Sequence, residues 1–396
     1  MNNMVFRYAG SGLISLLCFV GLSVTGSASA QSSEQPPLPT LSSSSYSRHA
    51  TVAVQSMQKW YELQTGLYKT TGWWNSANVI TVLADYSKSQ QSHAYDFVFS
   101  NTLSAAQKKF PDFINEYYDD EGWWALAWID VYEHTHDQRY LEAARFIFQD
   151  MTYAWDDTCS GGIWWSKDRK YKNAIANELF LSVAAELAVD TTDLTLRKQY
   201  LAWAHKEWSW FLHSGMINAE NLVNDGLDAK CENNGQKTWT YNQGVILGGL
   251  AAMSRADHDS SVLPLANSIA RATLSNLTDS QGILHDSCEP RCGADGTQFK
   301  GIFVRNLRVL NEASPQGSHY RQFILTNASS IWSQAQPPDY HLGEVWAPPG
   351  EPAPSAESTQ PTPATQPRRP MLSIPDASTQ SSALDTLVAA AFVSKK

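Results

Sequence analysis

The chain has 396 residues, which is enough for one large domain or two of ordinary size. Its 39 acidic residues outnumber its 29 lysines and arginines, so the formal net charge is -10. Because no basic stripe is present, we expect neither nucleic acid nor an anionic membrane surface as a partner. The 15 tryptophans cluster beside polar residues, which favours a platform for a flat ligand face such as that of a sugar.

Residues 1–30 have the pattern of a secretory signal peptide. Arg7 supplies the positive charge, an apolar run follows from Leu13 to Val20, and Ala28-Ser29-Ala30 has the small-residue form of a cleavage site. The apolar run is too short to cross a membrane. We therefore expect a secreted, extracellular protein without a transmembrane span.

Two segments of biased composition flank the region expected to fold. Residues 31–47 form a Ser/Pro-rich linker with too few apolar residues to pack, and residues 347–396 have the composition of a Pro-rich tail. We expect both segments to be disordered and the folded catalytic domain to span residues 48–346. A lipid-anchor signal is disfavoured because the last segment is only mildly apolar and ends in two lysines.

The region between these segments has the periodicity of helices. Apolar residues recur at i, i+3, i+4 and i+7 in about eleven segments from His49 to Gln334, whereas alternation with period two is nearly absent. The fold class predicted from this pattern is all-α.

A weak internal repeat accompanies the helices. Glycine followed by aromatic or branched residues recurs at 72–74, 122–124, 161–165, 225–227 and 281–284. Intervals of roughly 40 to 65 residues match one helical hairpin per repeat, and roughly six hairpins would form an open solenoid or a closed ring. In a ring these loops would line one mouth, although capping and packing of each hairpin would explain them as well.

Four cysteines remain once the predicted signal peptide is removed, and they allow three pairings. In an exported chain disulfides are favoured over free buried thiols. Cys288 and Cys292 would close the tight CEPRC loop, which leaves Cys159 to pair with Cys231. Two sequons, at Asn276 and Asn327, are candidate glycosylation sites if the host glycosylates.

No metal or other cofactor is expected from the sequence. The cysteines lack the accompanying His-x3-His or Cys-x2-Cys motif of a zinc site. The ten histidines offer only the spacing His134-x-His136, which we interpret as a solvated cap at the C-terminal end of a helix.

The stretch NEYYDDEGWWALAWID places Asp119 and Asp120 directly before a Trp-rich helix. At a helix entry, adjacent carboxyl groups can approach to about 5 Å, the separation used by retaining glycosidases. Two charges that close cannot both ionise easily, so one pKa rises, while the helix N-terminus favours the other group as a carboxylate. Trp123 would exclude water and offer a stacking face. The alternative is that the pair only caps the helix.

Four ordered blocks of sequence resemble glycoside hydrolase family 76, the endo-α-1,6-mannanases, which include fungal cell-wall proteins. The blocks are YYDDEGWWALAWIDVYEHTHDQRYLEAARFIFQDM, CSGGIWWSKDRKYKNAIANELFLSVAAELA, NDGLDAKCENNGQKTWTYNQGVILGGLAAM and CGADGTQFKGIFVRNL, and the resemblance covers roughly residues 48–335. It implies an (α/α)6 barrel, a toroid of about six helical hairpins. It also implies that Asp119 is the nucleophile and Asp120 the acid/base of a retaining reaction.

Further residues are candidates for binding substrate, and each has a structural alternative. Trp239 and Tyr241 are platforms or core residues, and the resemblance places their block at the cleft. Asn242 is a helix cap or a ligand for hydroxyl groups, and Asp225 is a turn residue or a binding group. The full set of predicted substrate-binding residues is Trp123, Asn75, Asn78, Asp225, Trp239, Tyr241 and Asn242.

The resemblance implies an endo-1,6-α-mannosidase that acts on α-1,6-mannan or mannose-containing oligosaccharides, in carbohydrate catabolism or at a cell wall. We expect it to be a secreted monomer. The alternative is a transglycosylase that attaches glycan or GPI-anchor mannan to cell-wall polymer through the same aspartates, because both routes share one covalent intermediate. A glycan-binding module or helical scaffold is a non-enzymatic hypothesis. An epimerase on the same barrel is disfavoured because no histidine lies in a matching block.

Overall fold

The structure is a computed structural model that describes residues 41–314, 320–348 and 375–395. These residues belong to one compact unit, residues 38–396. The predicted signal peptide, most of the predicted linker and residues 349–374 of the predicted tail lie outside the described residues.

The described residues form twelve helices of ten or more residues, in two sets. The inner set consists of α2 (Trp73–Gln90), α4 (Tyr118–Thr135), α6 (Ala174–Val189), α8 (Thr240–Asp257), α11 (Phe299–Ala313) and α13 (Ala377–Val393). The outer set consists of α1 (Ser43–Met57), α3 (Asp96–Ala105), α5 (Gln138–Thr152), α7 (Leu194–His213), α9 (Leu263–Asn276) and α12 (Arg321–Ser333).

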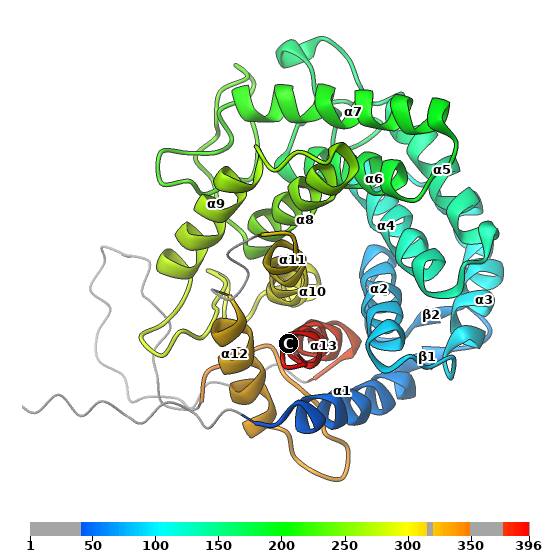
Figure 1. Ribbon diagram of the computed structural model, residues 1–396, viewed down its shortest axis with the longest axis vertical. Coiled ribbons are helices and arrows are strands. Elements are labelled where there is room, and N and C mark those ends of the chain that lie inside the picture. The colour runs from blue at the N-terminus through cyan, green and yellow to red at the C-terminus, as the bar shows by residue number, and fades with distance from the viewer. Residues whose placement is uncertain (1–40, 315–319, 349–374, 396) are drawn as a thin grey trace, which may run out of the picture. The chain divides into compact units, whose positions relative to one another are not determined.

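The inner helices close into a ring. Helix α2 packs against α4, and the contacts continue through α6, α8, α11 and α13, which packs back against α2 (Figure 1). One outer helix precedes each inner helix in the chain, so the inner helices all run in the same direction. The unit is therefore an (α/α)6 barrel, as predicted.

Short elements complete the described chain. β1 (Tyr61–Glu62) and β2 (Leu67–Tyr68) form one antiparallel pair, with Tyr61 opposite Tyr68 and Glu62 opposite Leu67. The short elements are η1 (Gln58–Trp60), β1 (Tyr61–Glu62), β2 (Leu67–Tyr68), η2 (Ala106–Lys108), η3 (Pro111–Phe113), η4 (Thr158–Ser160) and α10 (Gly293–Gly296). None of the described helices is both long enough and apolar enough to span a lipid bilayer.

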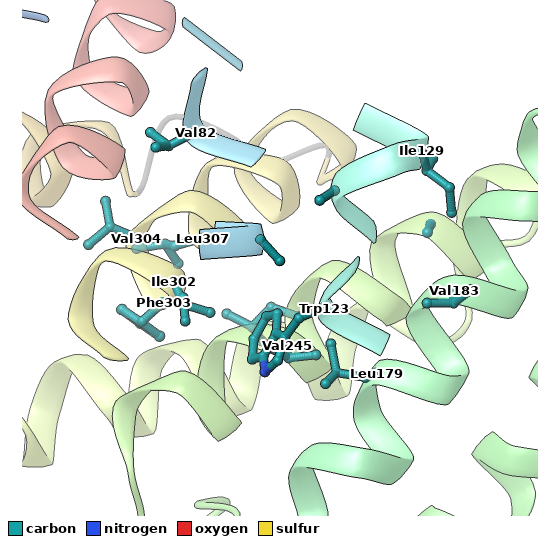
Figure 2. Packing of buried hydrophobic residues seen from close by; sticks show 14 of the residues in the cluster. Val82, Trp123, Ile129, Leu179, Val183, Val245, Ile302, Phe303, Val304 and Leu307 are labelled. Atoms are coloured by element: carbon teal, nitrogen blue, oxygen red, sulfur yellow. The ribbon is translucent and has the colours of Figure 1, made fainter. Parts of the chain in front are cut away.

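The two sets of helices differ in how their sequences place apolar residues. The outer helix α5 buries one stripe only: Tyr140, Leu141, Ala144, Ile147, Phe148 and Met151. The inner helix α6 is buried on nearly all sides and is apolar almost throughout, as its sequence AIANELFLSVAAELAV requires. Figure 2 shows side chains of several inner helices, among them Leu179, Val245 and Phe303, packing toward one another near Trp123.

Two predicted domain boundaries need correction. Ser43 begins helix α1, so the predicted linker 31–47 overlaps the folded unit. The expectation of a disordered tail over 347–396 is wrong for Ala377–Val393, which form the inner helix α13 with 16 of 17 residues buried. Helix α13 is enclosed by α1, α2, α11 and α12, so it needs small side chains rather than one strong apolar stripe. For this reason the sequence of the segment is only weakly apolar.

Helix α13 is held by close packing and by a buried ion pair. Arg305 of α11 donates to both carboxylate oxygens of Asp385 at 3.0 and 3.2 Å. A Cβ added at Gly301 would lie 2.4 Å from the Ser382 carbonyl oxygen and 2.5 Å from its Cα. The two helices can therefore approach this closely only because residue 301 is glycine.

This packing predicts the effect of a single methyl group. Gly301→Ala should lower the free energy of unfolding by about 1–3 kcal/mol, because the added Cβ forces α11 and α13 apart. Gly343→Ala is the matched control, since a Cβ at that position meets nothing within 4 Å. Chemical denaturation followed by circular dichroism measures both variants, and equal stability of the two would contradict the position of α13.

Candidate active site

A pocket of about 510 Å³ lies where the N-terminal ends of the inner helices meet. The N-terminal ends carry partial positive charge from unpaired backbone N–H groups, so the pocket favours anionic side chains. The residues that line it come from the N-terminal ends of α2, α4, α8 and α11, from α10, and from the loops before α4, α6 and α8. They are Trp74, Tyr117, Asp119, Asp120, Trp123, Trp165, Tyr171, Asn173, Asp225, Tyr241, Asp295 and Phe299.

Asp119 and Asp120 occupy the first turn of α4, and neither is the N-cap residue, which is Tyr117. One Asp119 oxygen accepts the indole N–H of Trp165 at 3.0 Å, and the other accepts the backbone N–H of Asp120 at 3.1 Å. Asp120 accepts the side-chain amide of Asn115 at 2.6 Å. Each carboxyl group is therefore oriented by its own donors.

The environment raises the pKa of both carboxyl groups. Burial is the main cause for Asp119, and the neighbouring charge of Asp120 adds to it, while the hydrogen bond from Trp165 opposes it. Burial also raises the pKa of Asp120, opposed by the hydrogen bond from Asn115, and the charge of Asp295 raises it further. The pair is therefore suited to hold one proton near neutral pH.

Aromatic rings make up much of the lining of the pocket. Tyr241 stacks on Phe299 with ring centroids 3.8 Å apart and an interplanar angle of 12°. Trp123 stacks with Trp74 at 5.6 Å and with Tyr241 at 6.4 Å. Such faces match the apolar C–H surface of a pyranose ring.

Two further carboxyl groups face the pocket. Asp225 accepts the hydroxyl of Tyr171 at 2.6 Å, and burial together with this carboxylate raises the Tyr171 pKa. Asp295 accepts the indole N–H of Trp74 at 3.0 Å. The pocket thus combines four carboxyl groups with stacked aromatic rings, an arrangement that can bind hydroxyl groups and transfer protons.

Five of the predicted site residues meet in the pocket: Asp119, Asp120, Trp123, Asp225 and Tyr241. Asn75 and Asn78 do not. Asn75 accepts the Gly72 N–H at 3.1 Å and donates to Gln298 at 2.8 Å, so it fixes the start of α2. Asn78 accepts from Arg305 at 2.7 Å inside the barrel. Their prediction as sugar contacts is corrected, because both amides are buried and already paired.

Trp239 and Asn242 also lie outside the pocket lining. Trp239 is the N-cap residue of α8 and meets Phe299 edge-on, with ring centroids 5.6 Å apart. Asn242 is fully buried, and its side-chain oxygen and nitrogen have no hydrogen-bond partner among the described residues. Trp239 therefore packs against the lining residue Phe299, and neither Trp239 nor Asn242 lines the pocket itself.

Sequence reasoning missed several lining residues. Trp74 and Trp165 lie within the recurring Gly-aromatic loops, so that repeat was a usable signal. Tyr171, Asp295 and Phe299 reach the pocket from loops and helices whose approach only the folded barrel reveals.

The predicted disulfides are both confirmed, and one sequon is corrected. Cys159 pairs with Cys231, and Cys288 pairs with Cys292. Asn327 is fully buried, accepts the Leu284 N–H at 2.9 Å and donates to the Gly282 carbonyl at 3.0 Å, so it cannot carry a glycan in the folded protein. Asn276 is exposed and stays a candidate.

Residues 45–364 match the model of glycosyl hydrolase family 76. The chain is 27% identical over 272 residues to the mannan endo-1,6-alpha-mannosidase DFG5 of Candida albicans, covering 62% of this chain and 59% of that protein. It is 26% identical over 269 residues to the mannan endo-1,6-alpha-mannosidase DCW1 of Saccharomyces cerevisiae, with the same two coverages, 62% and 59%. The matched region thus spans about six-tenths of the length of these relatives.

Solved structures share the fold. The alpha-1,6-mannanase GH76A of Salegentibacter sp. HEL1_6, an inactive variant with two consecutive aspartates replaced by alanine, in complex with alpha-1,6-mannotetrose, has a TM-score of 0.72 and 22% identity. That match covers 88% of this chain and 99% of that chain. Dfg5 from Chaetomium thermophilum in complex with glucosamine has a TM-score of 0.74 and 19% identity, covering 90% and 92% of the two chains.

The raised pKa values predict a stability change with pH. Below the ordinary aspartate pKa near 4, the folded and the unfolded chain both hold the proton. As the pH rises above this value, the unfolded chain ionises while the folded chain keeps the proton. The wild type therefore loses stability until the pH passes the raised folded-state pKa. Asp119→Asn and Asp120→Asn should therefore gain about 1–3 kcal/mol relative to the wild type between pH 5 and pH 8. Thermal unfolding at both pH values measures this gain.

The control for that experiment is Asp157→Asn, an exposed aspartate in the loop before η4. It should leave the difference between the two pH values as in the wild type. If Asp119→Asn and Asp120→Asn gain no more stability than this control, burial of the two carboxyl groups does not destabilise the folded chain.

Proposed function

Since the chain belongs to glycosyl hydrolase family 76, we propose that it is a secreted, retaining glycoside hydrolase that cleaves α-1,6-mannosidic linkages in mannan. One observation carries the proposal: Asp119 and Asp120 share one helix turn in an aromatic-lined pocket, each held by separate donors. The relatives named mannan endo-1,6-alpha-mannosidase support the substrate, as does the mannotetrose complex of a mannanase inactivated at two consecutive aspartates.

In the first step Asp119 attacks the anomeric carbon of the mannose on the non-reducing side of the bond. The C1–O6 bond breaks, and Asp120 gives its proton to the leaving oxygen. In the second step Asp120 takes a proton from water, whose oxygen attacks C1 and releases Asp119. Two displacements at C1 return the α configuration, so the product forms with retention.

Several contacts support this division of roles. The indole N–H of Trp165 and the backbone N–H of Asp120 stabilise Asp119 as a carboxylate, together with the N-terminal end of α4. The charge of Asp295 disfavours ionisation of Asp120, which is the group that must hold the proton. Burial and the charge of Asp120 nevertheless raise the pKa of Asp119 more than the surroundings raise that of Asp120. The proposed mechanism therefore requires the shared proton to move to Asp120 when the substrate is in place.

Substrate binding uses the rest of the pocket. The stacked rings of Trp123, Tyr241 and Phe299 offer apolar faces to mannose, and the carboxylates of Asp225 and Asp295 accept hydrogen bonds from its hydroxyl groups. Tyr171 and Trp74 fix the positions of these two carboxylates.

Transfer to a sugar hydroxyl instead of water is the second candidate function. It is favoured by the similarity to Dfg5 from Chaetomium thermophilum, solved in complex with glucosamine, whose ammonium group would suit a pocket with four carboxyl groups. The first chemical step is the same, and only the acceptor differs.

The catalytic assignment predicts loss of activity without loss of fold. Asp119→Asn and Asp120→Asn should each reduce cleavage of linear α-1,6-mannan by about 10³-fold or more, because one removes the nucleophile and the other the proton donor. Release of reducing ends measures the rate, circular dichroism verifies the fold, and Asp157→Asn serves as the active control. If either variant keeps near wild-type hydrolysis, the assignment is wrong.

The choice between hydrolysis and transfer predicts a product ratio. With α-1,6-mannan as the donor and glucosamine or mannobiose as the acceptor, reducing mannooligosaccharides should dominate, and their first-formed anomer should be α. Mass spectrometry and NMR follow the products over time. A predominance of acceptor-linked products at low acceptor concentration would overturn hydrolysis in favour of transfer.

A further inference from the structure

Three side chains of the kinds that bind metals meet at the C-terminal end of α4, away from the pocket. They are His93 in the loop after α2, Asp96 at the start of α3 and His134 in the last turn of α4. His134 lies fifteen residues beyond Asp119, so about 22 Å of helix separates this cluster from the catalytic pair. It is therefore no part of the site already described.

The geometry of the cluster is compact. His93 Nδ1 lies 2.9 Å from one carboxylate oxygen of Asp96, and His134 Nε2 lies 2.9 Å from the other. The candidate ligand atoms of all three residues lie within 4.8 Å of one another, and the two imidazole rings are stacked with centroids 5.0 Å apart. One carboxylate thus stands between two imidazole nitrogens that point toward it.

The fold holds two of the three groups in place. The His134 side chain is 5% exposed, and its ring meets the edge of Phe99 from α3, with centroids 6.0 Å apart. Asp96 starts α3, and its backbone N–H donates to the His93 carbonyl at 3.3 Å. His93 is 70% exposed, so a ligand can enter from solvent on that side.

We propose that His93, Asp96 and His134 bind one divalent transition-metal ion, with Zn²⁺ as the best match. Zinc takes imidazole nitrogen at 2.0–2.1 Å and carboxylate oxygen at about 2.0–2.2 Å, so tetrahedral ligand atoms lie about 3.3 Å apart. The two nitrogen–oxygen distances in the cluster, 2.9 Å each, are shorter than this value, and the upper limit of 4.8 Å between ligand atoms is longer. Small side-chain rotations can therefore bring the three ligand atoms to the spacing that zinc requires. Water completes the fourth position. Ca²⁺ and Mg²⁺ prefer oxygen ligands and match two imidazoles poorly.

The competing interpretation is a hydrogen-bonded trio, in which both imidazoles donate N–H to Asp96 and no ion binds. The two interpretations differ in their response to added metal. A bound ion would join α3 and the loop after α2 to the end of α4, and it would stabilise the folded state because it binds only the folded chain. A hydrogen-bonded trio without an ion would not change its stability when metal is added. The inference is independent of the proposed function, because none of the three residues lines the pocket.

The test uses the full chain without an affinity tag, treated with EDTA and then dialysed. Titration calorimetry with Zn²⁺ should give about one ion per chain, and saturating Zn²⁺ should raise the midpoint of thermal unfolding by several degrees. Equal concentrations of Ca²⁺ or Mg²⁺ should leave the midpoint unchanged. His93→Ala should abolish the response to Zn²⁺ while the fold is kept, because His93 is mostly exposed.

His205→Ala is the matched control, since His205 also pairs with an aspartate, Asp257, at 3.0 Å and is exposed. That variant should respond to Zn²⁺ like the wild type. His134→Ala should lose the response as well. If this substitution of a buried residue unfolds the chain, His93→Ala still tests the proposal. The proposal is overturned if the wild type shows no Zn²⁺-dependent shift, or if His93→Ala shows the same shift.

Discussion

The proposed activity depends on holding two adjacent carboxyl groups, Asp119 and Asp120, in one partly desolvated helix turn. Burying a carboxylate costs free energy unless donors and a favourable dipole offset it. Here the donors come from elsewhere in the chain: Asn115 from the loop before α4, and Trp165 from the loop before α6. The first turn of α4 can keep both acids only while these loops and the inner ring stay in place.

The ring separates this site from a second polar region. A cavity of about 430 Å³ lies among the C-terminal halves of the inner helices and is lined by paired charges, among them Lys88 with Asp130 and Arg308 with Asp85. Trp123 lines both this cavity and the catalytic pocket. Trp123 therefore lies between the charged residues inside the barrel and the acids proposed to react.

Periodicity was sufficient to predict an all-α fold, because apolar stripes of outer helices and apolar runs of inner helices are local signals. The Gly-aromatic repeat left an open solenoid and a closed ring as alternatives, and the (α/α)6 barrel followed from the family resemblance. Helix α13 escaped prediction because its small residues are selected by close approach to α11 at Gly301, a tertiary constraint.

The acid pair and Trp123 were visible as one local motif. Asn75 and Asn78 were misassigned because asparagine at a helix entry satisfies buried partners as readily as sugar hydroxyls. Asp295 and the His93–Asp96–His134 cluster arise only from folding.

The most direct test of the account is to trap the covalent intermediate. A mannosyl donor with an activated leaving group, and with fluorine on the ring to slow the second step, should label the wild-type chain with one sugar. Peptide mapping by mass spectrometry should place that sugar on Asp119, and Asp119→Asn should not be labelled. A label on Asp120, or no label while mannan is still cleaved, would contradict the account.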